Sequence, residues 1–436
     1  MKKILFFNLL IVFSLEGFLK RSRRSKHGED CYSDEACEEG LFCKLNRCYT
    51  KYESLNLKLL GLYETNICDL KKKCKGDNIC VKHRCVDKDT PKQQKVTHSE
   101  EIDDVHLVFA GNINLNKKPY YSGIKKDGSI NYDDLFDNIQ STIKSADLAL
   151  VPLETAFYIS QDGKKVINNP KKTPKELGDA IYKAGFRAVL HAASTAYSLK
   201  EKGILDTINF WKINYPDLHV LGISSNLEES NNDYYIYTKN NIKIGIINYS
   251  AFVGSDIPQK YKYMVNIISQ KKVEETIEKI KNLVDFIIIC VNWGKRSSTT
   301  PNSIQIKWAK QLASLGVNLI IGYYPIYTQP ATFVKAPNGK RALVFFSLGM
   351  LVGDNDKKTS DLGALANIVI SKVNNRAYIS SYSLIPTVNH KTKERYTVYK
   401  LTKYNQNLAN EVKNKYPLKK LINECKQTMG AFAHCG

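Results

Sequence analysis

The side chains that could do chemistry in this chain stand mostly where expected strands end, which is where α/β folds place their sites. Glu154 follows one such strand, and His191 ends another. Acid–base or metal chemistry needs several such groups close together, and one carboxylate and one histidine do not by themselves define such a site.

Both residues have a structural interpretation. We expect Glu154 to cap a helix or to pair with an arginine, and His191 to be a packed, hydrogen-bonded core residue. The alternative for His191 is a single compensating metal ligand. The sequence has no Ser-His-Asp spacing, no phosphate-binding Gly-rich loop and no His-Glu-x-x-His motif, so we name no catalytic residue.

The elements that must position these residues alternate between strands and helices. Apolar residues at every fourth position predict a helix through Leu135, Ile139 and Ile143, and Asn-Asn pairs at 240–241 and 374–375 predict hairpin turns. Strands that alternate with helices and are followed by hairpins predict an α/β (α+β) domain with a mixed sheet. The expected strands cover 106–110, 147–151, 187–190, 218–222, 234–237, 242–249, 286–291, 317–321 and 343–346.

Short motifs follow the ends of these strands in a fixed order. They are Gly111-Asn112, Leu153-Glu154, Ala193-Ser194-Thr195, Asn292-Trp293-Gly294, Gly322-Tyr323-Tyr324-Pro325 and Ser347-Leu348-Gly349. In order and spacing they resemble the motifs of the CapA capsule-synthesis family (poly-gamma-glutamate biosynthesis proteins), a branch of the calcineurin-like metallophosphatase superfamily. The resemblance covers Val108 to Lys372. It implies a metallophosphatase-like domain with layered αββα architecture.

Where the family carries metal ligands, this sequence carries other residues. The family's Gly-Asp is Gly-Asn here, its Asn-Asn-His is Ala-Ser-Thr, and its His-Trp-Gly is Asn-Trp-Gly. Its Gly-His-His-Pro-His becomes Gly-Tyr-Tyr-Pro-Ile, and tyrosine does not replace an imidazole ligand. We therefore predict no bound metal, no cofactor and a vestigial site. Its residues are Asn112, Glu154, Ser194, Thr195, Asn292, Trp293, Tyr323 and Tyr324.

The aromatic residues of the vestigial site allow two interpretations. Rings beside amide and hydroxyl groups suit the binding of a sugar or polymer by stacking and hydrogen bonding. Alternatively, Trp293, Tyr323 and Tyr324 fill the volume that metals and water would occupy.

Two four-cysteine modules, 31–48 and 68–85, precede the large domain. Both separate successive cysteines by five, five and four residues, which indicates an internal repeat. We favour two disulfides per module, first to third and second to fourth, although four cysteines allow three pairings. Zinc binding is the alternative, but a secretory signal is expected and no Cys-x-x-Cys occurs. The cysteines are Cys31, Cys37, Cys43, Cys48, Cys68, Cys74, Cys80 and Cys85.

The remaining segments complete the predicted organisation. A basic start and an apolar run indicate a signal peptide over 1–17, and 18–30 is a basic flank. Whether Arg21-Ser22-Arg23-Arg24 in that flank is a processing site stays open. Residues 86–104 are expected to be a linker and 105–436 the CapA-like domain.

Three cysteines fall in the large domain. Cys425 and Cys435 are expected to form a disulfide that ties the C-terminal tail. Cys290 stands in an apolar strand and is expected to be a buried free thiol.

The balance of charge favours acidic partners. The chain has 64 Lys and Arg against 43 Asp and Glu, a net charge of +21, although a solvated lysine-rich surface without a partner is the alternative. We expect a secreted protein of the extracellular space or the secretory lumen, with no transmembrane segment in the mature chain and no nucleic-acid partner. It would be catalytically degenerate and bind an extracellular protein or an anionic polymer or glycan.

Two other functions stay open. One is an active metal-dependent hydrolase or transferase with a rebuilt site, acting on a polyglutamate-like or glycan polymer. The other is a structural or adhesive surface protein that uses its basic cysteine modules.

Overall fold

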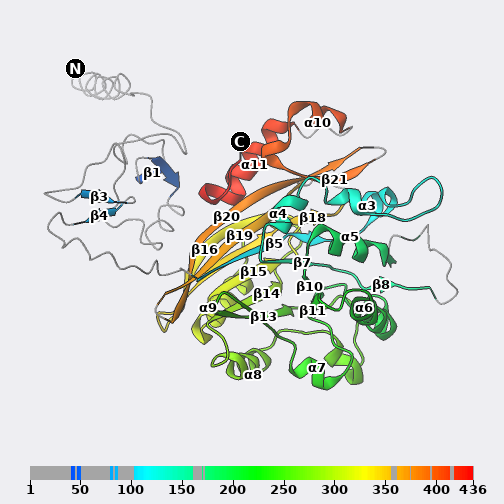
Figure 1. Cartoon of the computed structure of the whole chain (residues 1–436), viewed down its shortest axis with the longest axis horizontal. Coiled ribbons are helices and arrows are strands. Elements are labelled where there is room, and N and C mark those ends of the chain that lie inside the picture. The colour runs from blue at the N-terminus through cyan, green and yellow to red at the C-terminus, as the bar shows by residue number, and fades with distance from the viewer. Residues whose placement is uncertain are drawn as a thin grey trace, which may run out of the picture. The chain divides into compact units, whose positions relative to one another are not determined.

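The chain divides into two compact units, 1–99 and 100–436, and each is described by itself. The structure is a computed structural model (Figure 1). In the first unit it describes short backbone stretches, and in the second unit most of the chain. The described residues are 41–44, 47–50, 79–81, 84–86, 103–160, 169, 172–354, 361–373, 375–392, 395–412 and 417–435.

The first unit contains two short antiparallel hairpins. One places Cys43 opposite Cys48, and the other places Cys80 opposite Cys85. The predicted signal peptide, basic flank and pairing of the eight N-terminal cysteines lie outside the described residues. The hairpin strands are β1 (Leu41–Lys44), β2 (Arg47–Thr50), β3 (Ile79–Val81) and β4 (Arg84–Val86).

The second unit contains a seven-stranded mixed sheet in the order β11-β10-β7-β5-β19-β20-β21. Strands β11, β10, β7 and β5 are parallel, and β19 to β21 run antiparallel to their neighbours. β5 begins at Asp103, inside the predicted linker, because Asp103 and Asp104 pair with Lys372 and Ser371 of β19. The strands are β5 (Asp103–Ala110), β7 (Leu148–Pro152), β10 (Ala188–Leu190), β11 (His219–Leu221), β19 (Leu362–Val373), β20 (Arg376–Lys391) and β21 (Tyr396–Lys400).

A six-stranded mixed sheet in the order β12-β13-β14-β15-β17-β16 lies against the first. Its four central strands, β13, β14, β15 and β17, are parallel. The predicted hairpin at 240–241 joins β12 to β13, and both asparagines there have positive φ. The strands are β12 (Tyr235–Lys239), β13 (Ile242–Ser250), β14 (Phe286–Asn292), β15 (Leu319–Tyr323), β16 (Thr328–Lys335) and β17 (Arg341–Leu348).

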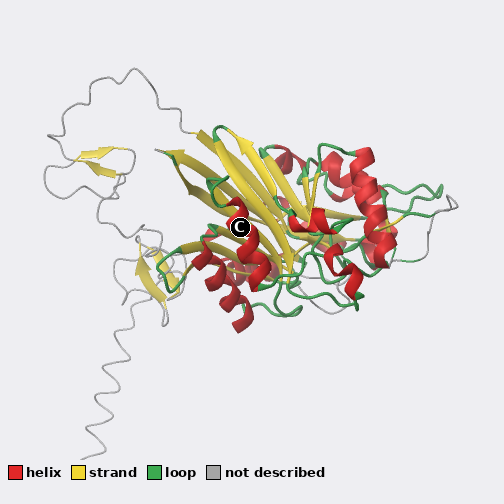
Figure 2. Ribbon diagram, turned by 90° about the horizontal axis from the view of Figure 1, so that it is seen from below, coloured by secondary structure: helices red, strands yellow, loops and turns green. Residues whose placement is uncertain are grey.

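Helices cover the outer faces of both sheets, so the unit has the predicted αββα layers (Figures 1 and 2). Small two-stranded pairs, β6 with β18 and β8 with β9, lie beside the main sheets. These elements are β6 (Asn112–Ile113), β8 (Phe157–Tyr158), β9 (Thr173–Pro174), β18 (Met350–Val352), α3 (Lys117–Ser122), α4 (Gln140–Lys144), α5 (Glu176–Ala184), α6 (Lys200–Asn214), α7 (Leu227–Asn231), α8 (Gln270–Ile280), α9 (Ser303–Leu315), α10 (Gln406–Glu411) and α11 (Leu418–Met429), with short 3-10 turns at Asp133–Leu135, Gln259–Met264, Leu401–Lys403 and Gly430–Phe432.

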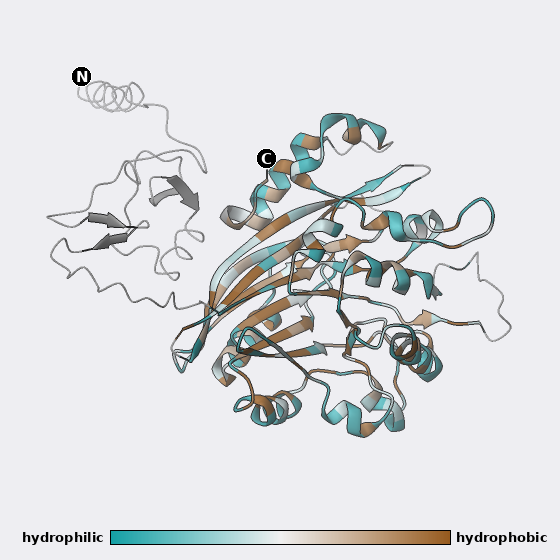
Figure 3. Cartoon of the chain, in the orientation of Figure 1, coloured by the Kyte–Doolittle hydropathy of each residue, from teal (hydrophilic) through white to brown (hydrophobic). Residues whose placement is uncertain are grey.

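Strand alternation builds three cores from this arrangement. In β5, Leu107 and Phe109 enter the core between the sheets, while Val108 packs under the helices of the first sheet. In β14, Ile288 faces the core between the sheets and Ile289 faces α8 and α9. Both faces of these strands are therefore buried, and the strands are coloured hydrophobic over much of their length in Figure 3.

The helix predicted through Leu135, Ile139 and Ile143 is wrong in extent. The segment forms a 3-10 turn at 133–135 and a five-residue helix, α4, although all three apolar residues are buried as expected. The Thr397 hydroxyl donates to the Asp134 carbonyl (2.6 Å). The backbone there closes i to i+3 hydrogen bonds, from Phe136 N to the Asp133 carbonyl (3.2 Å) and from Ile139 N to the Phe136 carbonyl (2.9 Å), so the segment is a series of tight turns.

The C-terminal tail is part of the core between the sheets. Leu421, Cys425 and Met429 of α11 pack into it, and Cys425 is joined to Cys435 by a disulfide. Cys290 is a buried free thiol. Among the described residues, no helix combines the length and the apolar character needed to cross a membrane.

Candidate functional site

The carboxyl ends of the parallel strands of both sheets meet at one edge of the large unit. Three hydrogen bonds link the two sheets there: Ala192 N donates to Asn248 Oδ1 (2.7 Å), Gly254 N to the Ser194 carbonyl (2.8 Å), and Asn112 N to the Gly349 carbonyl (2.9 Å). This edge is the place where the vestigial site was predicted.

Glu154 is a buried carboxylate at this edge. Its side chain is 0 % exposed, Oε2 accepts a hydrogen bond from Asn114 Nδ2, and Oε1 has no partner among the described residues. Burial raises the pKa of Glu154, while the Arg296 charge and the Asn114 hydrogen bond act in the opposite direction. Among the described residues, the carboxylate of Glu154 therefore has the Asn114 amide as its hydrogen-bond partner and does not cap a helix.

Asn112, two residues before the Asn114 that contacts Glu154, is also buried. Neither its Oδ1 nor its Nδ2 has a hydrogen-bond partner in the described part of the chain. The preceding Gly111 is required by close packing, because a Cβ there would lie 2.8 Å from the Gly349 carbonyl oxygen. Asn112 thus keeps the backbone position of an aspartate ligand without its charge.

His191 is a core residue, as the structural interpretation expected. Trp211 Nε1 donates to His191 Nε2 (3.0 Å), so the lone pair that a metal would need is already used. Burial lowers the pKa of His191 to about 3, against a smaller opposite effect of a hydrogen bond with the Leu153 backbone. The imidazole is therefore neutral at physiological pH.

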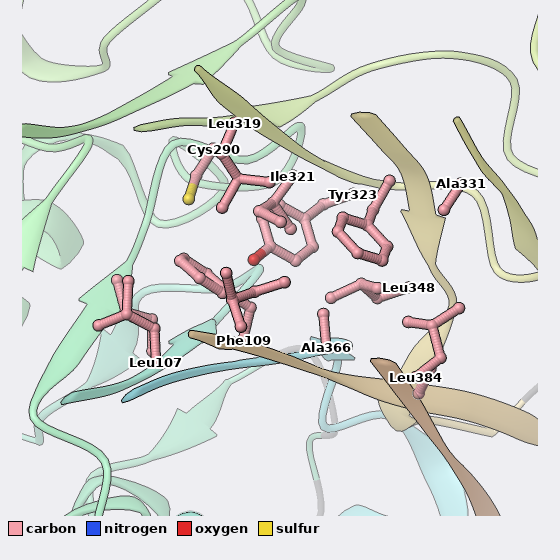
Figure 4. Close-up of a cluster of buried hydrophobic side chains, with 14 of the residues drawn as sticks. Leu107, Phe109, Cys290, Leu319, Ile321, Tyr323, Ala331, Leu348, Ala366 and Leu384 are labelled. Carbon is pink, nitrogen blue, oxygen red and sulfur yellow. The ribbon is translucent and has the colours of Figure 1, made fainter. Parts of the chain in front are cut away.

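Two of the predicted aromatic residues are core rings rather than a binding platform. Trp293 is fully buried, donates from Nε1 to the Phe346 carbonyl (3.0 Å) and stacks on the Phe346 ring. Tyr323 is 1 % exposed and lies in the core between the sheets, with Phe109 and Cys290 (Figure 4). A ligand cannot stack on either ring, because protein atoms cover both.

The other predicted residues are buried (Ser194 and Asn292) or half-buried (Thr195 and Tyr324). Tyr324 is half-buried with a positive φ of 93° and packs edge-on against Phe252 at 4.7 Å between ring centroids. Thr195 donates to the Glu154 carbonyl (2.6 Å). Asn292 Oδ1 accepts from Ser250 Oγ (3.3 Å), and Ser194 contributes its carbonyl to the link between the sheets.

Two residues of the site were not predicted. Asn114 stands two positions after Asn112, and Arg296 stands two positions after Gly294. Their spacing from recognised motifs was the available signal. The hydrogen bond from Asn114 to Glu154 and the effect of the Arg296 charge on its pKa depend on chain folding, which spacing alone does not show.

These residues do not fit the two-metal centre that the resemblance implies. They offer one buried carboxylate, amides, hydroxyls and a histidine whose Nε2 is occupied, whereas such a centre needs several anionic or imidazole ligands. Within the described ranges, no group of three or more His, Cys, Asp or Glu residues is arranged to hold a metal ion.

Comparison with known proteins identifies relatives of this chain. It is 25% identical over 185 residues to the capsule biosynthesis protein CapA of Bacillus anthracis, which covers 41% of this chain and 43% of that protein. It is 20% identical over 269 residues to the PGA biosynthesis protein CapA of Bacillus subtilis (strain 168), which covers 61% and 67% of the two chains. The match to the first relative therefore covers less than half of that protein's length.

A structural match is the calcineurin-like phosphoesterase YfkN from Bacillus subtilis. Its TM-score is 0.39 at 13% identity, and the match covers 75% of this chain and 96% of that one. The model of the bacterial capsule synthesis protein family PGA_cap matches residues 106–355, which is more than half of the chain. On this match, the protein belongs to the PGA_cap family of bacterial capsule synthesis proteins.

Proposed function

We propose that this protein is a secreted, catalytically degenerate CapA-like protein that binds an anionic polymer. The observation that carries the proposal is the set of side chains at the strand-end edge. Glu154 is the buried carboxylate there, His191 is engaged by Trp211, and the remaining groups are neutral apart from Arg296. Such a set is suited to hydrogen bonding and charge pairing rather than to holding two cations.

The charge of the chain supports an anionic ligand. A net charge of +21 raises the local concentration of polyanions and speeds their association. The two relatives are named for capsule and PGA biosynthesis, so a carboxylate-bearing polymer of the polyglutamate type is the first ligand to test.

The N-terminus supports secretion. The apolar run after Lys2 and Lys3 has the form of a signal peptide, and the repeated cysteine spacing suits an oxidising compartment. Fractionation of cells that express the full chain tests this part: we expect the protein in the medium or the secretory lumen, and a cytosolic protein with reduced cysteines would contradict it.

Polymer binding is tested with fluorescent poly-γ-glutamate and, as a control, a neutral dextran of the same length. We expect the full chain to bind the polyglutamate and not the dextran, with affinity falling steeply between about 50 and about 300 mM salt. Equal binding of the two polymers, or no binding at low salt, would contradict the proposal.

The same samples test for turnover. After long incubation with divalent cations, we expect the polymer to keep its length in size-exclusion chromatography. Metal-dependent shortening would instead establish an active hydrolase with a rebuilt site. A variant that lacks residues 25–90 tests the adhesive alternative, since loss of all binding in that variant would assign binding to the cysteine modules.

A further inference from the structure

Three buried polar atoms at the strand-end edge lack a partner. They are Asn112 Oδ1, Asn112 Nδ2 and Glu154 Oε1. Leaving such a group unsatisfied costs stability, so native proteins rarely keep several together without a ligand or water. Ile113 forms a parallel β-bridge with Leu153. Because side chains alternate along a strand, Asn112 and Glu154 lie on the face opposite to the side chains of that bridge. The contact of Asn114 with Glu154 places the same edge of β6 against this carboxylate.

Arg296, in the loop that follows β14 of the six-stranded sheet, supplies a positive charge at this edge. Arg296 is half-buried, and in the described part of the chain its guanidinium makes no hydrogen bond or ion pair. Its charge nonetheless lowers the pKa of Glu154, against the larger effect of burial, although no ion pair joins these two described side chains. A guanidinium that has no partner among the described residues keeps its five N–H donors for an anion.

A short series of hydrogen bonds ties Arg296 to the Asn112 side of the edge. Ile326 N donates to the Arg296 carbonyl (2.8 Å), and the Ser347 hydroxyl donates to the neighbouring Pro325 carbonyl (3.1 Å). Gly349 N donates to the Ser347 hydroxyl (3.1 Å), and the Gly349 carbonyl accepts from Asn112 N (2.9 Å). The backbones of Arg296 and Asn112 are therefore held at the same edge by the loops after β15 and β17.

We propose that Asn112, Glu154 and Arg296 form a binding site for an oxyanion, a carboxylate or phosphate group, with the arginine in place of metal ions as the source of positive charge. The proposal rests on the proposed function, because it names the chemical group of the polymer that this edge would hold. The guanidinium pairs with two oxygens of the anion at once. Asn112 Nδ2 donates a further hydrogen bond to it.

Glu154 fits this site in its neutral form. Burial raises its pKa, so an anion nearby would favour the protonated carboxyl, whose Oε1 hydroxyl then donates to the ligand. A cation at the same place would need an ionised Glu154 and would be repelled by Arg296. The two alternatives therefore make opposite predictions for the same pair of substitutions.

The test measures binding of glutarate and of inorganic phosphate to the full chain by calorimetry. We expect saturable binding of at least one, and the stronger of the two identifies the carboxylate or phosphate source. Arg296→Gln should weaken it roughly tenfold or more. Glu154→Gln keeps a neutral donor and should leave it within about threefold. Lys295→Gln is the matched control, because it removes an exposed positive charge one residue away and should change binding by less than about twofold.

Several outcomes would overturn the site. Loss of anion binding in Glu154→Gln together with retention in Arg296→Gln would show that the guanidinium does not hold the anion. Equal weakening by Arg296→Gln and Lys295→Gln would reduce it to diffuse surface attraction. Thermal unfolding of each variant confirms that it is folded before binding is measured.

The site and the proposed function can fail separately. If poly-γ-glutamate binds wild type and Arg296→Gln alike while neither small anion binds, the oxyanion site is wrong and polymer binding stands. If glutarate or phosphate binds in an Arg296-dependent way while the polymer does not bind, the site stands and the polymer function is wrong.

Discussion

Two buried polar clusters of the large unit differ in how completely their groups are paired. In the first, the lysine clamp, Lys391 Nζ lies 2.5 Å from Asp361 Oδ1 and 3.4 Å from Asp354 Oδ1. Asn116 exchanges two hydrogen bonds of 2.8 Å with the backbone of Asp354, and Asn389 N donates to the Asp361 carbonyl. In the second, the strand-end centre of Asn112, Glu154 and Arg296, three side-chain atoms have no partner among the described residues.

The difference separates a structural cluster from a binding one. A buried charge cluster that only stabilises the fold must satisfy its own groups, because unpaired buried charges are costly. The lysine clamp does so and holds the segments that follow β18 and precede β19. The strand-end centre leaves groups open on a rigid edge between two sheets, which is the arrangement expected where a ligand supplies the missing partners.

Breaking the lysine clamp should have the largest effect. Lys391→Met keeps the side-chain volume but leaves Asp354 and Asp361 buried without their cation, and should lower the free energy of unfolding by roughly 3–5 kcal/mol. Urea denaturation measures it. Lys335→Met, at an exposed position of β16, is the control and should change it by less than about 0.5 kcal/mol. A similar small loss in both variants would show that the clamp contributes little.

Removing the C-terminal disulfide should come next. The double variant Cys425→Ala/Cys435→Ala opens a loop with a sequence separation of 10 residues and should cost roughly 2–3 kcal/mol, mainly by freeing the unfolded chain. Urea denaturation under non-reducing conditions measures the loss. An unchanged midpoint would mean that packing of α11 alone holds the tail.

His191→Leu tests the claim that this histidine is structural. The variant leaves Trp211 Nε1 without an acceptor and should cost roughly 1–3 kcal/mol. Because burial lowers the pKa of His191 to about 3, the unfolded chain takes up a proton below about pH 6.5 that the folded chain does not.

The free energy of unfolding of wild type should therefore fall as the pH drops from about 6.5 towards 3, and this part of the slope should be absent in His191→Leu. Stability measured across that range checks the sign. If His191 instead bound a metal, a chelator would lower the stability of wild type to that of His191→Leu, and the difference between the two proteins would disappear.

Glu154→Gln should stabilise the protein slightly. Burial raises the folded pKa of Glu154 above 4.5, so between 4.5 and that pKa the folded state holds more protons than the unfolded state. The stability of wild type should thus decrease as the pH rises through this window, and the penalty persists at neutral pH. We expect Glu154→Gln to remove the decrease and to gain roughly 1 kcal/mol at pH 7.

The exposed Glu275→Gln is the control for this change, with no more than about 0.5 kcal/mol expected. A large loss of stability in Glu154→Gln would show that an ionised Glu154 is needed for folding, which contradicts the account of the strand-end centre.

Tyr323→Phe should have the smallest effect. It removes a buried hydroxyl whose polar neighbour is the Cys290 thiol, a weak hydrogen-bonding group, so stability should change by less than about 1 kcal/mol. Polymer binding should be unchanged. Loss of polymer binding without loss of stability would show that Tyr323 contacts the ligand.

Much of the fold could be predicted from sequence because its signals are local. Alternating or continuous apolar strands and the Asn-Asn turn at 240–241 each carry their own geometry. Glycines at strand ends report close backbone packing: a Cβ at Gly322 would lie 2.1 Å from the Phe346 carbonyl oxygen. The motifs thus indicated the backbone shape of this edge.

The rest depended on contacts between distant parts of the chain. The segment through Leu135 forms a 3-10 turn and a short helix, and the Thr397 hydroxyl from a distant strand bonds a carbonyl of that segment. Residue type alone did not show that Trp293 and Tyr323 point into the core. Arg296 could not be assigned to the site, since its distance from Glu154 is set by the packing of one sheet on the other.

The central claim is that the strand-end centre uses an arginine rather than metal ions. The most direct test is the metal content of the full chain, secreted and oxidised, after dialysis against mixed Mn, Zn and Fe and removal of loosely bound ions. We predict well under one ion per chain for wild type. One or two tightly held ions per chain, lost in Glu154→Gln, would contradict the account and make the large unit a metal-dependent member of its family.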